Sequence, residues 1–153
     1  MSKMTAARRL VAAAGTDGKS RVVLEEPLPL DGEPERIRLT NLWMGPLERA
    51  DNLAPFDGGF IPFAMSQTQG NTYAMTLVEY TPGFGREDPG MHATQTLDHF
   101  YVLEGEIVIV LEVGEAVLHD GETGIIRGAT HGWRNDGAQI AKLLFFVVPA
   151  ELR

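Results

Sequence analysis

Short apolar runs separated by turn-forming residues dominate the pattern along this 153-residue chain. In residues 37–44, apolar and polar side chains alternate in the way that a half-buried strand requires. Residues 72–80 predict a second strand, which Thr81, Pro82 and Gly83 terminate. Five later runs rich in β-branched and aromatic residues predict further strands, at residues 100–103, 107–113, 116–118, 124–126 and 140–148. No stretch sustains a helical period, so the regular spacing of short strands predicts an all-β sandwich or barrel.

The N-terminal part of the chain predicts a β-hairpin. Residues 8–14 and 20–26 are compatible with strands and flank a turn that contains Asp17 and Gly18. A short helix is the alternative, because residues 12–14 are three alanines, which favour helices. We favour the hairpin.

Two segments between the predicted strands read as loops. Residues 27–34 contain three prolines, which cannot donate to a strand ladder. Residues 45–70 are rich in Pro, Gly, Asp and Asn and carry Phe56, Phe60, Ile61 and Phe63. A loop of this length is often functional, and its aromatic residues suggest a lid. We therefore expect one structural domain, in which a barrel spans residues 71–150 and residues 1–70 form an extension packed on the barrel or on a second subunit.

Composition narrows the classes of partner. Thirteen basic and 21 acidic residues give a formal net charge of −8, and no basic run is present, so nucleic-acid binding is not expected. The most apolar stretch, residues 140–150, is interrupted by Lys142 and is too short to cross a bilayer, so no membrane partner is expected. The chain has no cysteine, which excludes thiolate chemistry and agrees with a cytoplasmic protein.

Two histidine-bearing segments, around His92 and ending at His131, flank a glycine-punctuated hairpin that can bring both imidazoles into one cavity. Along a strand, successive side chains point to opposite faces. His92, Thr94 and Asp98 share one parity, whereas His99 has the other and is expected to point away from them. The functional residues are therefore expected between residues 90 and 135.

Two sequence patterns in this stretch resemble the motifs of the cupin superfamily, and specifically those of small single-domain cupins. The spacing from His92 to Gly105 matches the first motif, G-x5-H-x-H-x3/4-E-x6-G, with Thr94 at the second histidine and Asp98 at the glutamate. The ending GATHGWRN, which contains His131, matches the second motif, although its proline is missing. The resemblance covers about residues 72–148. It implies a jelly-roll barrel, or double-stranded β-helix, here with an N-terminal hairpin extension, and commonly a homodimer.

The resemblance also implies a metal site. Carried over residue by residue, the ligands of metal-binding cupins correspond here to His92, Asp98 and His131, with no ligand at Thr94. Two imidazoles and one carboxylate can hold iron, manganese, nickel or zinc. Asp98 is one methylene shorter than glutamate. The sequence therefore leaves open whether the site holds one divalent metal or none. Without a metal, Asp98 can orient an imidazole instead.

The predicted catalytic residues are accordingly His92, Asp98 and His131. Thr94, Gln95, Phe100 and Trp133 are predicted to bind the substrate or line its cavity. The leading hypothesis is a small-molecule enzyme, metal-dependent and of oxygenase, isomerase or lyase type, acting on a hydrophobic or carbonyl-containing metabolite. Without a metal, the same groups suffice for acid–base chemistry. The alternative is a metal-free cupin that binds or senses a small ligand, and the sequence does not decide whether the protein is an enzyme.

Overall fold

The structure, a computed structural model, describes residues 8–28, 31–33, 35–59 and 70–151. All the regular elements in these ranges are β-strands. Their bounds are β1 Arg8–Ala14, β2 Ser20–Pro27, β3 Asp31–Glu33, β4 Ile37–Pro46, β5 Thr72–Tyr80, β6 Thr96–Glu104, β7 Glu106–Leu111, β8 Glu115–His119, β9 Thr123–Arg127, β10 His131–Arg134 and β11 Ala141–Pro149. Among these residues no helix is long and apolar enough to cross a membrane.

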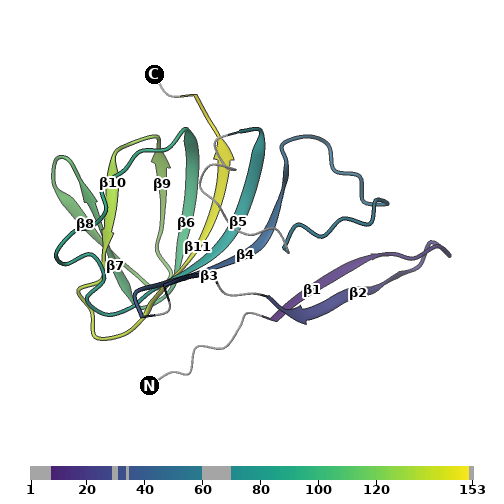
Figure 1. Cartoon of the computed structure of the whole chain (residues 1–153), viewed down its shortest axis with the longest axis horizontal. Coiled ribbons are helices and arrows are strands. Elements are labelled where there is room, and N and C mark those ends of the chain that lie inside the picture. The colour runs from purple at the N-terminus through teal and green to yellow at the C-terminus, as the bar shows by residue number, and fades with distance from the viewer. Residues whose placement is uncertain (1–7, 29–30, 34, 60–69, 152–153) are drawn as a thin grey trace.

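Two antiparallel sheets form the body of the molecule (Figure 1). The larger sheet has the order β3-β4-β5-β11-β6-β9, and the smaller has the order β10-β7-β8. β1 and β2 pair only with each other and extend from one side of the body as a separate hairpin. The predictions of an all-β fold and of an N-terminal hairpin are therefore confirmed.

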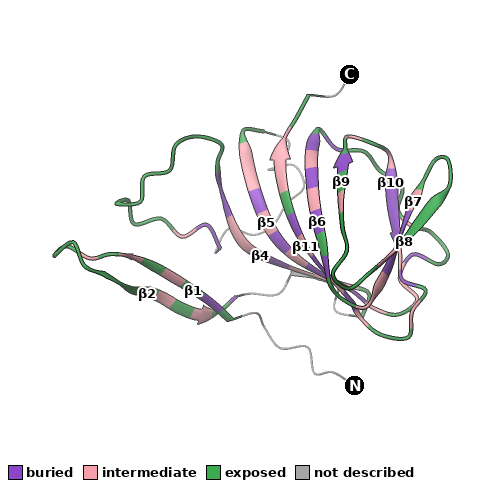
Figure 2. Cartoon of the chain, turned by 180° about the vertical axis from the view of Figure 1, so that it is seen from behind, coloured by how far each residue is buried: buried purple, intermediate pink, exposed green. Residues whose placement is uncertain are grey.

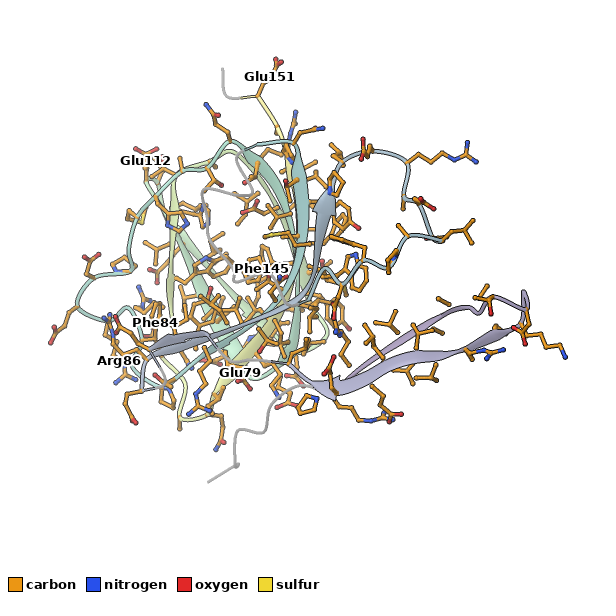
Figure 3. All side chains as sticks on the ribbon, turned by 45° about the vertical axis from the view of Figure 1, so that its right-hand side comes forward. Glu79, Phe84, Arg86, Glu112, Phe145 and Glu151 are labelled. Carbon is orange, nitrogen blue, oxygen red and sulfur yellow. The ribbon has the colours of Figure 1, made fainter. Side chains whose placement is uncertain are left out.

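The core lies between the two sheets and follows from the alternation of the strands. On β6, Thr96, Asp98, Phe100 and Val102 are buried on the inner face, and the residues between them are more exposed. Figure 2 shows this alternation as buried bands along the inner strands, in contrast to the mainly exposed hairpin. Phe145 of β11 lies in the interior, where it packs against the rings of Phe100 and Trp133, and Figure 3 shows it among the strands.

Several strand bounds differ from those expected from the sequence. The predicted loop at residues 27–34 contains β3, which pairs with the first residues of β4 through a tight turn. The predicted loop at residues 45–70 begins later, because β4 continues to Pro46. β6 begins four residues earlier than residue 100, and the four-residue β10 was missed because GATHGWRN contains few β-branched residues. Tertiary pairing overrode the local preference in each case.

The described part of the long loop packs on the hairpin side of the molecule and not over the core. Arg9 of β1 is buried, ion-paired with Asp57 of the loop, and lies over the ring of Trp43. Phe56 packs edge-on against the same Trp43 ring, with centroids 5.7 Å apart. The two other aromatic residues of the loop, Phe60 and Phe63, and the neighbouring Ile61 lie outside the described residues.

Candidate functional site

A cavity of about 530 Å³ opens between the two sheets. Most of its wall is apolar and is contributed by Ile37, Leu39, Val78, Tyr80, Phe84, Pro89, Ala93, Trp133, Phe145 and Val147. The remaining lining residues are Thr76, Gly90, His92, Thr94, Thr96, Asp98 and His131. Few polar groups on an apolar wall are typical of a small-molecule site.

Backbone pairing brings the two histidines of the cavity together. The amide of each residue donates to the carbonyl of the other, with both N···O distances 2.9 Å, so the segment before β6 runs beside the start of β10. This approach requires Gly132, because a Cβ there would lie 2.6 Å from the carbonyl oxygen of Pro89. His131 is almost fully buried, whereas His92 is exposed at the cavity mouth.

Both imidazoles use the same nitrogen to bind a backbone carbonyl. Nδ1 of His92 lies 2.7 Å from the oxygen of Gly90, and Nδ1 of His131 lies 2.8 Å from the oxygen of Ala129. A carbonyl oxygen can only accept, so Nδ1 of each ring carries the hydrogen. In the neutral ring, Nε2 then has a free lone pair, and the ring centroids lie 4.6 Å apart.

Three side chains of the first motif form a buried chain of hydrogen bonds. The Thr96 hydroxyl donates to Oδ1 of Asp98 over 2.7 Å. The hydroxyl oxygens of Thr94 and Thr96 are 2.5 Å apart. Because the hydrogen of the Thr96 hydroxyl is donated to Asp98, Thr94 is the donor in the bond between the two threonines. These hydrogen bonds fix the Asp98 carboxylate. Thr94, the first member of the chain, occupies the position at which the first-motif pattern has its second histidine.

The predicted site residues do not all reach the cavity. His92, Thr94, Asp98, His131 and Trp133 line it. Gln95 and Phe100, which were predicted to bind substrate, do not line it.

Gln95 is exposed, because it follows Thr94 with the opposite strand parity. Phe100 is buried in the core with Trp133, ring centroids 5.1 Å apart, and does not line the cavity. His99 lies on the outer face of β6, where Nδ1 is 3.1 Å from the carbonyl oxygen of Phe146, as its parity predicted.

Among the lining residues that sequence reasoning missed, three carry a hydroxyl group: Thr76, Tyr80 and Thr96. The alternation of the strand at residues 72–80 carried the signal, because Thr76, Val78 and Tyr80 share one face. Thr96 has the parity of Thr94 and Asp98. For β5, which carries no motif residue, the sequence did not show which face pointed inward.

Burial lowers the pKa of His131 below its ordinary value. The bond to the Ala129 carbonyl and the charge of Asp98 oppose this shift, and His92 adds to it. His131 is therefore a neutral imidazole at pH 7. Burial and the nearby charge of Asp98 also raise the pKa of Tyr80, so its hydroxyl stays protonated.

We expect this shift to make the fold sensitive to mild acid. Because the pKa of His131 is lower in the folded state, the unfolded state binds more protons as the pH falls below about 6.5, the usual histidine value. The free energy of unfolding should therefore be at its full value above about pH 6.5 and should decline as the pH falls through the folded-state pKa. Urea titrations of the wild type and of His131→Gln measure this, and the same decline in both would contradict it.

The cavity wall carries two imidazoles and one carboxylate, which are groups that can bind a divalent metal. The hydrogen bonds from Nδ1 to backbone carbonyls fix the orientation of both rings, as in known metal sites. Nε2 of each histidine is left free to bind a metal. However, among the described residues no group of three His, Cys, Asp or Glu side chains lies close enough together to hold one. His92, Asp98 and His131 all line the cavity but do not form such a group, and the Thr96 hydroxyl already donates to Asp98. The residues present therefore do not fit a three-ligand metal site.

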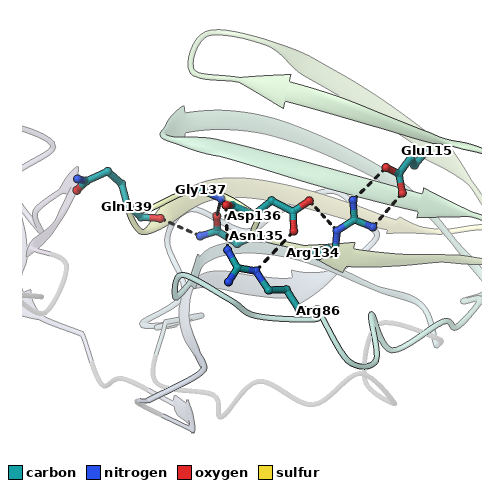
Figure 4. Close-up of polar contacts among 7 residues, drawn as sticks. All are labelled: Arg86, Glu115, Arg134, Asn135, Asp136, Gly137 and Gln139. Carbon is teal, nitrogen blue, oxygen red and sulfur yellow. Dashed lines mark hydrogen bonds and ion pairs between the residues drawn. The ribbon is translucent and has the colours of Figure 1, made fainter.

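The end of β10 is fixed by a polar network, which Figure 4 shows. Arg134 makes a two-point ion pair with Glu115 of β8 and also binds Asp136. Asn135 is fully buried and makes three hydrogen bonds: Nδ2 donates to the carbonyls of Tyr80 and Gln139, and Oδ1 accepts from the amide of Gly137. These bonds connect the strand that carries His131 to the strand that carries Thr76.

Comparison with known families agrees with this architecture. Residues 76–147 match the model of the cupin domain. Residues 76–147 are therefore a cupin domain, and the fold of the described residues is the all-β cupin fold. The cupin domain of Cnp3 from Schizosaccharomyces pombe has the same fold, with a TM-score of 0.54, 13% identity, and coverage of 93% of this chain and 87% of that one.

Two fungal relatives show local sequence similarity. Phomopsin biosynthesis cluster protein C' of Diaporthe leptostromiformis is 39% identical over 62 residues, which is 40% of this chain and 31% of the relative. Oryzines biosynthesis cluster protein J of Aspergillus oryzae (strain ATCC 42149 / RIB 40) is 36% identical over 76 residues, which is 48% of this chain and 41% of the relative. The chain thus spans less than half the length of these relatives.

Proposed function

We propose that this cupin is an enzyme that binds a small, mainly apolar metabolite between its two sheets and transfers a proton at a carbon next to a carbonyl group. The observation that carries the proposal is the state of His131. It is buried on the cavity wall and neutral, with Nδ1 occupied and the Nε2 lone pair free. A neutral imidazole on the wall of a mainly apolar cavity is suited to act as a general base.

The proposed step balances without a co-reactant. His131 Nε2 takes the proton from the carbon next to the carbonyl, and the C–H electron pair becomes the C=C bond of an enolate. The negative charge passes to the oxygen, and the imidazolium returns the proton to the same or to a conjugated carbon. The second case is an isomerisation. The Asp98 carboxylate favours the protonated imidazole, because its charge raises the pKa of His131.

The relatives support a role in small-molecule metabolism, since two of them are named for biosynthesis clusters. The experiment that tests the proposal is hydrogen–deuterium exchange in D₂O of small neutral ketones, acetophenone and 1-tetralone, followed by NMR. We expect the protein to accelerate exchange at the carbon next to the carbonyl above the buffer rate. Binding of these ketones without any acceleration would favour the alternative, a binding or sensing cupin.

Metal content separates this proposal from the metal-dependent hypothesis. Because the residues do not form a three-ligand site, we expect protein purified without chelators or an affinity tag to contain far less than one equivalent of iron, manganese, nickel or zinc. Elemental mass spectrometry of the wild type and of the double variant His92→Ala/His131→Ala measures this. One equivalent in the wild type that is lost in the double variant would overturn the assignment.

We also propose that the protein is a homodimer. The isolated hairpin exposes Leu10, Val22 and Val23, and the outer face of the larger sheet exposes Ile125 and Phe146. Burying both surfaces against a second copy would remove apolar area from water. Sedimentation at micromolar concentration should give the mass of two chains, and Leu10→Glu/Val22→Glu should give one. A wild type that sediments as a single chain would contradict this proposal.

A further inference from the structure

The charge of the cavity wall restricts which ligands can enter. Among the described residues that line the cavity there is no lysine and no arginine. The one carboxylate, Asp98, is buried, and both His131 and the Tyr80 hydroxyl are neutral at pH 7. A carboxylate or phosphate in this cavity would lose its hydration, find no cation and meet the charge of Asp98.

One polar atom of the wall has no partner. Thr76 lies in the middle of β5 and is 2% exposed, and its hydroxyl is buried without a hydrogen bond. It faces the cavity between apolar neighbours: Val78 follows on the same strand face, and Phe145 lies opposite on β11. A buried hydroxyl without a partner is unfavourable, because it has lost its bonds to water.

Thr76 and His131 lie on different sheets. Thr76 belongs to the larger sheet through β5, and His131 belongs to the smaller sheet through β10, yet both line the same cavity. A ligand between the sheets can therefore contact the base from one side and the free hydroxyl from the other. Apart from the Thr76 hydroxyl and the first-motif residues, the described residues of the cavity wall offer a ligand mainly apolar contacts.

We propose that the ligand is a neutral molecule with an apolar skeleton and a carbonyl or hydroxyl oxygen, and that Thr76 Oγ1 hydrogen-bonds this oxygen. The inference rests on the proposed function in that it names the substrate class of the same cavity. In the proton-transfer step, the Thr76 hydroxyl donates to the oxygen that becomes negative, which is the usual way in which an enolate is stabilised.

The test uses three probes that share one ring: acetophenone, ethylbenzene, which lacks the oxygen, and benzoate, which carries a charge. Binding is measured by saturation-transfer NMR titration of the full chain at pH 7. We expect acetophenone to bind the wild type at least about fivefold more tightly than ethylbenzene, as one net hydrogen bond allows. Benzoate should bind at least about tenfold more weakly than acetophenone.

Two variants isolate the hydroxyl. Thr76→Val keeps the shape and removes the oxygen, and should weaken acetophenone about fivefold while leaving ethylbenzene unchanged or tighter. Thr76→Ser keeps the hydroxyl and should retain the preference for acetophenone. Matching far-ultraviolet circular dichroism spectra show that both variants are folded.

The proposal is overturned if benzoate binds as tightly as acetophenone, if acetophenone does not bind, or if Thr76→Val weakens both neutral probes equally. Its failure can be distinguished from that of the proposed function, because binding and deuterium exchange are separate readouts. The expected binding pattern without any exchange would remove the proton-transfer step and keep the substrate class. Ketone exchange, together with acetophenone binding that Thr76→Val does not weaken, would keep the proton-transfer step and remove the proposed substrate class.

Discussion

Replacing His131 by glutamine should lower the enzyme-catalysed exchange of ketone protons at least about 100-fold, the usual contribution of a general base. Glutamine can fill much of the imidazole volume and still bond a backbone carbonyl, but it has no basic nitrogen. His131 alone among the four histidines is buried, and it lines the cavity. Exchange rates measured by NMR for the wild type and the variant give this ratio.

His99→Gln is the matched control. His99 makes the same kind of contact, from Nδ1 to a backbone carbonyl, but it lies on the outer face of β6. We expect this variant to keep the wild-type exchange rate within about twofold, because no part of it reaches the cavity. Equal losses in both variants would mean that the effect comes from folding and not from proton transfer.

Replacing Asn135 by alanine should destabilise the protein by about 3 kcal/mol, because the fully buried Asn135 side chain makes three hydrogen bonds that alanine cannot make. The carbonyls of Tyr80 and Gln139 and the amide of Gly137 would all be affected. Since Tyr80 lines the cavity, ketone binding should weaken as well. Urea unfolding monitored by fluorescence measures the change in stability.

Asn71→Ala provides the comparison, because Asn71 is exposed; we expect a change within about 0.5 kcal/mol. If Asn135→Ala also fell within that range, the network of Figure 4 would not be what fixes the end of β10.

The strands and the positions of the motif residues followed from the sequence because both depend on local pattern. Alternation placed Asp98 inward and His99 outward, and turn residues marked most of the strand ends. The turn after β6 needs Gly105, whose φ of 81° other residues rarely adopt, and this position was readable as a motif glycine.

The composition of the cavity wall did not follow from the sequence, because it depends on how distant strands meet. Thr76 and His131 are 55 positions apart and belong to different sheets. The hydrogen bond from Thr96 to Asp98 depends on rotamers that strand parity does not specify. For the same reason, the sequence could not show whether the three expected ligands, which all line the cavity, lie close enough together to hold a metal; among the described residues no group of three does.

The most direct test of the central claim is the pH dependence of ketone exchange by the wild-type protein. If neutral His131 is the base, the rate should rise with pH through a value below the usual histidine pKa of about 6.5 and be level at pH 7, since burial lowers the pKa of His131. Asp98→Asn should move this rise to lower pH, because the charge that raises the pKa is removed. A rate that is independent of pH between about 4 and 7, or a rise that Asp98→Asn does not move, would contradict the account.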